Sequence, residues 1–181
     1  GLADAMMMKE VLGNVTKKKY VLTWAPHPKP LPLATPHSQM IMPALFGMDV
    51  VLACPKEFEL DAGVMAQASK LAQDGGGSFQ VMHNQTEALT GADIVCEKSW
   101  LSLEHFGDWA KEKEMRNQYA DWQVTSERMA VTNNGKFMHC LPVRRNVEVS
   151  DGVLDCPNSL IIQEAENRMW SQMALLRHIL S

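Results

Sequence analysis

Tyr20-Val21-Leu22-Thr23-Trp24 is a short, almost continuous run of aromatic, aliphatic and β-branched residues. A strand with one face in solvent alternates apolar and polar residues, whereas an unbroken apolar run is typical of a strand buried on both faces. Strands of that kind occur in parallel sheets that are covered by helices. The run at 20–24 therefore predicts a central strand of a parallel sheet.

Comparable runs alternate along the chain with stretches of helical periodicity. The apolar runs predict further strands at 47–53, 78–82, 92–96, 136–139 and 159–162. The periodic stretches predict helices at 38–46, 61–73, 85–89 and 164–180, the second of them opened by Asp61 and stopped by three glycines. This alternation predicts the α/β fold class, as a Rossmann-like parallel sheet with helices on both faces.

The last predicted helix carries an apolar stripe, which we interpret as core packing rather than a cofactor-binding motif. The stripe consists of Met169, Trp170, Met173, Leu176 and Leu180. Between Lys98 and Tyr119 the periodicity weakens and charges accumulate, which predicts a long excursion with short helices. Excursions of that length in compact domains often carry function.

Composition narrows the class of protein. The 181 residues suit one domain, and 46% of them are apolar, which permits a sizeable core. The net charge of -4 argues against nucleic acid or an anionic membrane as partner. No apolar run approaches the roughly 20 residues that span a bilayer. The four cysteines are scattered, which predicts reduced thiols of a cytoplasmic protein, and no metal-ligand spacing occurs.

Four chemically distinctive clusters follow predicted strands. They are 27–30 (His-Pro-Lys-Pro), 98–100 (Lys-Ser-Trp), 140–142 (Cys-Leu-Pro) and 164–168, which contains Arg168. In an open parallel sheet, ligands bind at the carboxyl ends of the strands, near a switch in strand order. Arg144-Arg145 adds a guanidinium pair suited to carboxylate or phosphate oxygens. The coincidence predicts an anion-binding site.

Each cluster also has a simpler interpretation. His27 is either a positioned imidazole over a pocket or part of a stiff proline-rich surface loop. Lys98 either binds a substrate carboxylate, with Trp100 as an apolar wall, or is a solvated lysine beside a core tryptophan. Arg168, which we place in the first turn of the last helix, either completes an anion site or pairs with Glu164 one turn earlier.

Cys140 is a weak candidate for a nucleophile. A nucleophilic thiol needs a positioned base, and the neighbouring His139 should point to the opposite face of the strand. We therefore interpret Cys140 as a small apolar wall. Pro142 should hold Leu141 extended and has no N–H of its own, so the Leu141 carbonyl is predicted to be an exposed acceptor for an amine.

Two segments carry a resemblance to a known family. Residues 137–146 (Phe-Met-His-Cys-Leu-Pro-Val-Arg-Arg-Asn) together with 164–168 (Glu-Ala-Glu-Asn-Arg) resemble the carbamoyltransferases. The residues at 24–32 (Trp-Ala-Pro-His-Pro-Lys-Pro-Leu-Pro) and at 98–100 resemble those of the branch of the family that acts on N-acylated ornithine. The resemblance extends over essentially the whole chain. It implies that residues 1–181 are the C-terminal ornithine-binding domain, with the N-terminal carbamoyl-phosphate domain absent.

The resemblance also implies an activity. These enzymes transfer a carbamoyl group from carbamoyl phosphate to the side-chain amine of N-acetyl-L-ornithine, giving N-acetylcitrulline and phosphate, in arginine biosynthesis. They are cytoplasmic, use no cofactor or metal, and share active-site residues between the subunits of a homotrimer. The expected partners of this chain are therefore carbamoyl phosphate and an N-acylated ornithine.

Site residues are carried over by motif. Cys140 and the Leu141 carbonyl would face the attacking amine, and Arg168 would contact carbamoyl phosphate. The predicted substrate-binding residues are His27, Lys98, Trp100, Arg144 and Glu164. Glu148 stands where some acetylornithine enzymes carry a lysine.

Three alternatives remain open from the sequence. Ala25-Pro26 and Leu31-Pro32 favour N-succinylornithine as the substrate, whereas Lys98-Ser99-Trp100 and the stretch that continues to Tyr119 favour N-acetylornithine. Ornithine itself is a poorer match. The alternative from a different class is a non-catalytic α/β module that binds an anionic metabolite.

Overall fold

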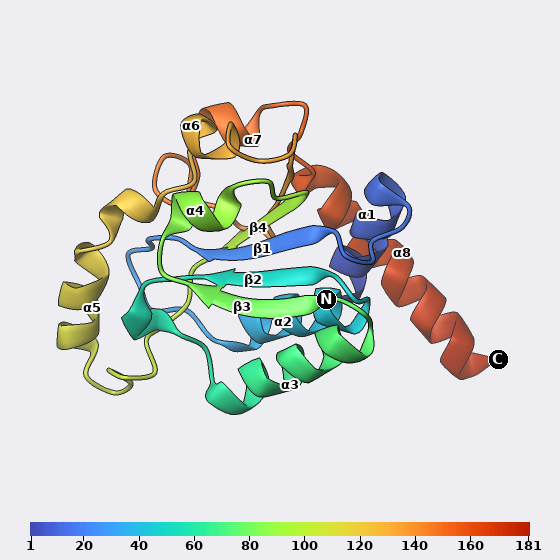
Figure 1. Cartoon of the computed structure of the whole chain (residues 1–181), viewed down its shortest axis with the longest axis horizontal. Helices are drawn as coiled ribbons and strands as arrows, with labels where there is room; N and C mark the ends of the chain where they lie inside the picture. Colours follow the sequence, from blue (N-terminus) through green and yellow to red (C-terminus); the bar gives the residue numbers. More distant parts are fainter.

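A five-stranded parallel sheet with strand order β3-β2-β1-β4-β5 forms the centre of the molecule (Figure 1). The computed structural model describes residues 1–181. The strands are β1 (Lys19–Trp24), β2 (Asp49–Ala53), β3 (Ser78–Met82), β4 (Ile94–Lys98) and β5 (Lys136–Met138). Every residue of β1 after Lys19 is buried, so the predicted fully buried central strand is confirmed.

Helices cover both faces of the sheet, as the alternating sequence pattern predicts. Helices α2 (Ala34–Leu45) and α3 (Ala62–Asp74) pack against each other on one face. On the other side lie α4 (Gln85–Leu89), α6 (Ser126–Met129) and α7 (Asp151–Leu154) (Figure 1). Helix α1 (Leu2–Leu12) packs along α8 (Ile161–Leu180), and α5 (Trp109–Asn117) belongs to the excursion after β4. Two 3-10 turns, at Lys56–Phe58 and Ala120–Trp122, complete the chain.

Glycine permits a close backbone contact beside β2. Gly75 and Gly77, after α3, lie directly against Gly47, which precedes β2. A Cβ atom at Gly75 would stand 2.7 Å from the Gly47 Cα, and one at Gly77 would stand 2.2 Å from the Met48 carbonyl oxygen. Any larger residue would separate the two turns, so Gly75 and Gly77 do more than end α3.

The predicted strand at 159–162 is wrong. Ser159 forms only an isolated bridge with Phe137, and α8 begins at Ile161. The Leu160 amide donates to the Phe137 carbonyl oxygen at 2.8 Å, which ends the pairing as the chain turns into the helix. An apolar run of four residues is too short to separate a strand from the buried first turn of a helix.

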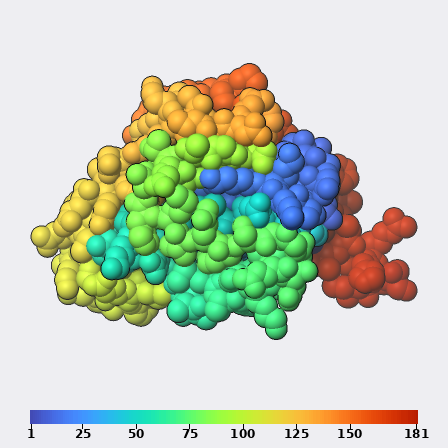
Figure 2. Space-filling view, viewed as in Figure 1, coloured from blue at the N-terminus to red at the C-terminus, as the bar shows by residue number.

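The apolar stripe on α8 is not core packing within this chain. Met169, Trp170, Met173 and Leu176 are each about half exposed, and Leu180 is 82% exposed. Figure 2 shows the end of this helix projecting from the body of the molecule. The periodicity of the stripe shows that this face of the helix is apolar, but it does not show what covers the face. No helix, α8 included, is both long and apolar enough to cross a membrane.

Arg116 anchors the excursion between β4 and β5. Its side chain is buried and pairs with Glu112 on the same helix. It also donates to Ser99 Oγ and to the Trp100 carbonyl oxygen, each at 2.9 Å. The guanidinium carbon lies 5.4 Å from the ring centre of Trp24. These contacts tie α5 to the segment that follows β4.

Replacing Arg116 with alanine should therefore destabilise the fold. The change leaves the Glu112 carboxylate buried without its partner, and breaking a buried pair in this way typically costs about 3–5 kcal/mol. Urea unfolding of the 181-residue chain measures the loss. Lys113→Ala, on the exposed face of α5, is the matched control and should change stability by less than about 0.5 kcal/mol. Equal stabilities of the two variants would contradict the anchoring role.

Candidate functional site

The strand order reverses between β1 and β4. From β1 the chain proceeds to β2 and β3 on one side, whereas β4 and β5 extend the sheet on the other. Trp24 and Lys98, the last residues of β1 and β4, lie opposite each other in the pairing register. The loops that leave these strands diverge, and ligands of open α/β sheets bind in the crevice that results.

A cavity of about 560 Å³ lies at this end of the sheet. It brings together five of the eight site residues predicted from the sequence: His27, Lys98, Cys140, Leu141 and Arg144. Thr35 and Glu148 also line it. Segments that are far apart in the sequence therefore form one polar site.

Arg168 lies in an adjoining cavity of about 400 Å³. Cys140, Leu141 and Thr35 line both cavities, so the Cys140-Leu141 backbone forms the boundary between them. Asp4 and Ser38 belong to the second cavity as well. The predicted site residues thus occupy two neighbouring spaces separated by one segment of chain.

Trp100 and Glu164 line neither cavity. Trp100 is fully buried, and its indole Nε1 donates to the Phe58 carbonyl oxygen at 2.7 Å. Glu164 is also buried and accepts the His139 amide at 2.9 Å. Burial, together with the nearby Asp4, raises the pKa of Glu164 to about 8. Glu164 thus holds the backbone next to Cys140, whereas Trp100 belongs to the hydrophobic core.

Cys140 and His139 face opposite sides, as strand geometry predicts. His139 is fully buried, whereas Cys140 lines both cavities. Burial lowers the pKa of His139 to about 3 and raises that of the Cys140 thiol. The thiol therefore stays protonated at neutral pH and has no base to activate it, which suits an apolar wall.

Leu141 does not adopt the predicted extended conformation. Its φ is +46°, in the left-handed region, and the Leu141–Pro142 peptide bond is cis. The Leu141 amide donates to His139 Nδ1 at 3.0 Å, which helps to hold this unusual backbone. No group of the chain donates to the Leu141 carbonyl oxygen. The carbonyl remains a free acceptor at the boundary between the two cavities.

Arg168 does not sit in the first turn of the last helix. Helix α8 begins at Ile161, so Arg168 falls in its second turn, beyond the free backbone N–H groups. It forms no ion pair with Glu164, whose carboxylate is turned toward His139. Its guanidinium therefore has to supply any anion contact by itself.

The two adjacent arginines have different surroundings. Arg144 Nε donates to His27 Nε2 at 3.0 Å, which joins the proline-rich loop after β1 to the loop after β5. Arg145 instead pairs with Asp151 at 2.8 Å and with Asp155 at 2.7 Å. Only Arg144 lines the cavity, so Arg145 does not contribute to the predicted anion pair.

Comparison with known proteins identifies the family of this chain. A family profile described as "Aspartate/ornithine carbamoyltransferase, Asp/Orn binding domain" matches residues 34–179. An N-acetylornithine carbamoyltransferase of Xanthomonas campestris pv. campestris is 46% identical over 178 residues, covering 97% of this chain and 52% of that protein. An N-succinylornithine carbamoyltransferase of Bacteroides thetaiotaomicron is 36% identical over 180 residues, covering 98% and 51%.

The same relationship holds in three dimensions. A crystal structure of acetylornithine transcarbamylase complexed with acetylcitrulline matches with a TM-score of 0.94 at 46% identity, covering 96% of this chain and 53% of that chain. This chain belongs to the aspartate/ornithine carbamoyltransferase family. It spans about half the length of the curated relatives that it matches.

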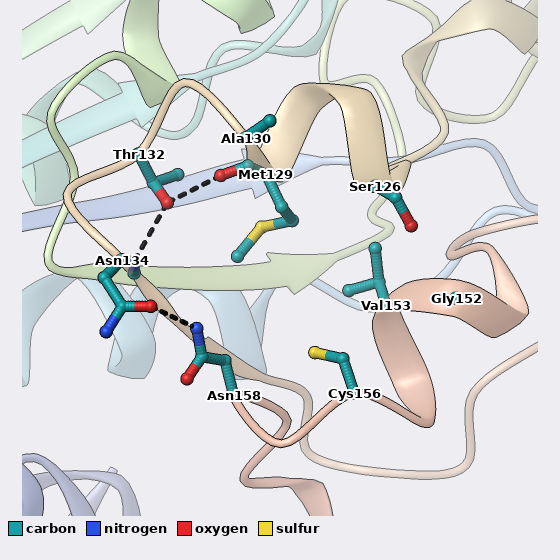
Figure 3. A pocket seen from close by; sticks show the side chains of 10 residues that line it. Ser126, Met129, Ala130, Thr132, Asn134, Gly152, Val153, Cys156 and Asn158 are labelled. Atoms are coloured by element: carbon teal, nitrogen blue, oxygen red, sulfur yellow. Dashed lines mark hydrogen bonds between the residues drawn. The ribbon is translucent and has the colours of Figure 1, made fainter.

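A third cavity of this carbamoyltransferase chain lies at the amino end of β5. It measures about 330 Å³, and Figure 3 shows Ser126, Met129, Asn134, Cys156 and Asn158 around it. Its amides are already paired, since Asn158 Nδ2 donates to Asn134 Oδ1 at 2.8 Å. It contains none of the predicted site residues and lies at the wrong end of the strands for a ligand of this fold.

Sequence patterns did not reveal every residue of the site. Thr35, which lines both cavities, was missed, and Glu148 was noted only through the family resemblance. Glu97, which lines neither cavity but precedes Lys98, was missed as well. Glu97 is fully buried at the end of β4, after the apolar Ile94-Val95-Cys96. A carboxylate that ends a buried strand is unusual and was the available signal.

Cys140 should react slowly with iodoacetamide at pH 7. The reactive species is the thiolate, and the raised pKa of Cys140 keeps its population below that of an ordinary thiol. Peptide mapping of the 181-residue chain gives the rate at this position, with free glutathione as the reference. The rate should continue to rise at pH 9. Faster alkylation than that of glutathione at pH 7 would show that Cys140 is an activated nucleophile.

Proposed function

We propose that residues 1–181 are the ornithine-binding domain of an N-acetylornithine carbamoyltransferase. The whole protein would transfer the carbamoyl group of carbamoyl phosphate to the side-chain amine of N-acetyl-L-ornithine, giving N-acetylcitrulline and phosphate. One observation carries the proposal: Lys98, the His27–Arg144 pair and the free Leu141 carbonyl surround one cavity at the switch in strand order. The 46% identity to an N-acetylornithine carbamoyltransferase supports this substrate.

The groups around the cavity match the functional groups of the substrate. N-acetylornithine carries a carboxylate, an acetamido group and a side-chain amine. The Lys98 ammonium would pair with the carboxylate, while the His27–Arg144 wall would contact the acyl part. The Leu141 carbonyl would accept an amine N–H and direct the nitrogen lone pair toward the carbamoyl carbon. The Cys140 side chain would pack beside it without reacting.

The adjoining cavity would face carbamoyl phosphate. In the transfer, the neutral amine forms a C–N bond with the carbamoyl carbon, the C–O bond to phosphate breaks, and the proton lost by the amine would pass to the leaving phosphate. Negative charge develops on the carbamoyl oxygen and the leaving phosphate, so fixed cations lower the barrier. Arg168 is the cation in that cavity, and Leu141 between the two spaces would bring the reactants together.

The other half of the site would come from outside these residues. Carbamoyl phosphate would be held chiefly by the N-terminal domain of the whole protein, which would act as a cytoplasmic homotrimer in arginine biosynthesis. The displacement needs positioning and charge stabilisation, so we assign no cofactor and no metal to it.

N-succinylornithine is the second candidate substrate. The Bacteroides N-succinylornithine carbamoyltransferase is 36% identical to this chain, and the Xanthomonas N-acetylornithine carbamoyltransferase is 46% identical. The comparison therefore favours the acetyl substrate. Ornithine is the third. A binding module without catalysis would use the same cavity for an anionic metabolite.

An assay of the full-length protein tests the proposal. Carbamoyl phosphate is supplied with N-acetylornithine, N-succinylornithine or ornithine, and the citrulline-type product is measured. N-acetylornithine should show the highest kcat/KM. Preference for another substrate would overturn the acetyl assignment, and no turnover of any would overturn the enzyme. Calorimetric binding without turnover would identify the non-catalytic module.

Arg168→Ala in the full-length protein should lower kcat at least ~100-fold, the scale for removing a group that stabilises charge in the transition state. Steady-state kinetics with N-acetylornithine measures the change. Lys70→Ala, an exposed lysine on α3, removes the same charge far from the site and serves as control. A near-normal kcat for Arg168→Ala would remove this residue from the mechanism.

Lys98→Met should act mainly on KM. A charge-assisted hydrogen bond contributes about 1.5–3 kcal/mol, so loss of the ammonium should raise the KM for N-acetylornithine roughly 10- to 100-fold. The KM for carbamoyl phosphate should stay unchanged, because Lys98 lines only the first cavity. If both KM values rise together, Lys98 has a structural role instead.

A further inference from the structure

Three buried ionisable side chains meet at the wall of the candidate cavity, which Glu148 lines while Glu97 and His139 do not. Glu97 at the end of β4, His139 after β5 and Glu148 in the following loop are each at most 1% exposed. They offer atoms that all lie within 4.8 Å of one another, and Glu97 Oε2 is 3.6 Å from His139 Nε2. Both Glu97 oxygens, His139 Nε2 and Glu148 Oε1 lack a hydrogen-bond partner. So many buried polar atoms without partners are costly and require a physical reason.

A metal ion does not suit this cluster. The Leu141 amide donates to His139 Nδ1 at 3.0 Å, so Nδ1 is the acceptor nitrogen of the ring. A neutral imidazole then carries its proton on Nε2, the nitrogen that faces the carboxyl groups. A protonated nitrogen has no lone pair for a metal but can donate to a carboxylate. The geometry therefore favours shared protons in this space.

The two carboxyl groups have unequal surroundings. Glu148 Oε2 accepts the Arg144 amide at 2.7 Å, so one oxygen of this carboxyl group has a donor. Glu97 receives no such donor, and burial together with the nearby Glu148 raises its pKa well above the usual range. Two carboxylates that share a buried site cannot both ionise without a large cost. The shared proton is thus expected on Glu97, the carboxyl group that has no hydrogen-bond donor.

We propose that Glu97 and Glu148 hold one proton between them at neutral pH, and that this acid pair positions the walls of the cavity. Glu148 fixes the backbone of Arg144, whose side chain contacts His27. His139, which faces Glu97, fixes the backbone of Leu141. Glu97 lies between these two connections. Both glutamates act through other residues and are positioning residues.

The protonation state of the pair should also affect Lys98. Lys98 follows Glu97 in the chain, and its charge lowers the pKa of both Glu97 and His139. With one proton on the pair, a single negative charge stands behind the Lys98 ammonium. Loss of that proton adds a second negative charge, which would draw the ammonium away from a substrate carboxylate. This effect on substrate binding rests on the proposed function, whereas the proton shared by Glu97 and Glu148 does not.

The sign of the pH effect follows from linkage. A carboxyl whose pKa is raised in the folded chain gives stability that is fully present below its unfolded pKa and is lost as pH rises through the folded one. Glu97→Gln mimics the protonated form and removes this loss. The groups that face the pair are Lys98 on β4, and His139 and the Arg144 amide after β5. His139 stays neutral at neutral pH, so it adds no opposing trend.

Urea unfolding of the 181-residue chain from pH 5 to 8.5 tests the proton. The ratio of the unfolding constants of wild type and Glu97→Gln should rise at least ~10-fold over this range, since one pKa unit corresponds to tenfold. Glu87→Gln, an exposed glutamate on α4, removes the same charge and should leave its ratio to wild type constant. A constant ratio for Glu97→Gln would overturn the proposal, because Glu97 would then be ionised throughout.

A second measurement does not depend on the variant folding. In wild-type chain with 13C-labelled glutamate and 15N-labelled histidine, one of the two assigned carboxyl groups of Glu97 and Glu148 should be neutral at pH 7, and His139 should be neutral with its proton on Nε2. The signal of Glu164 is assigned separately, because burial raises its pKa as well. Ionised carboxylates at both Glu97 and Glu148, or a cationic His139, would overturn the pair. Added Zn²⁺ should shift the thermal midpoint of wild type no more than it shifts the midpoint of Glu97→Gln. A selective rise would establish a metal site instead.

The consequence for the substrate is measured in the full-length enzyme. As pH rises, the KM for N-acetylornithine should increase for wild type relative to Glu97→Gln, while the ratio of kcat values stays constant. If the KM ratio is also constant, the pair does not act on the cavity. If no turnover is observed at all, the proposed function fails. The unfolding and labelling results still decide whether Glu97 and Glu148 share a proton.

Discussion

The pairing of β1 with β4 is the constraint on which the rest of the structure depends. It places Trp24 opposite Lys98 and reverses the strand order, so the loops after the two strands leave in opposite directions. The crevice between them is where the proline-rich loop carrying His27 and the loop carrying Arg144 meet. Without that reversal, the segments 25–32 and 139–148 would have no common cavity to line. The site is thus a consequence of topology before it is a consequence of particular side chains.

Buried polar groups then fix the walls of the crevice. Arg116 ties the chain after Lys98 to the core, and Glu164 and His139 hold the backbone from 139 to 141. The left-handed conformation of Leu141 is unfavourable for a branched side chain and persists because the amides around it are held by these partners. Its carbonyl is left as a free acceptor between the two cavities. In this chain the backbone from 139 to 141 is thus held by Glu164 and His139, which do not line the cavity themselves.

The sequence predicted the sheet well because its central strands are buried on both faces. An unbroken aromatic and β-branched run such as 20–24 fits few structures besides a buried strand, and strands at 78–82 and 136–139 were found from their own short apolar runs. Boundaries set by tertiary contacts were less accessible. The start of α8 at Ile161 depends on the hydrogen bond from Leu160 to Phe137, which no local pattern reveals, and the position of Arg168 was wrong for that reason.

The site residues show the same division. His27, Lys98, Cys140 and Arg144 follow strands, and the rule that ligands bind at strand ends was sufficient to bring them together. Trp100 and Glu164 belong to the same motifs but point into the core, since a motif gives the identity of a residue and not its direction. The apolar face of α8 was identified correctly, but its partner was not. Periodicity indicates which face of a helix is apolar and does not indicate which surface packs against that face. Glu97 was missed because its partners, Glu148 and His139, are far away in the sequence.

The location of the ligand at the strand switch is tested most directly by chemical-shift mapping. The isotopically labelled 181-residue chain is titrated with N-acetylornithine, and amide shifts are followed to saturation. The largest changes are expected at residues 27–35, at Lys98 and at 140–144, with none around Asn134 and Asn158. Saturable changes confined to the cavity at the amino end of β5, or no saturable change at all, would contradict a binding site formed where β1 and β4 end.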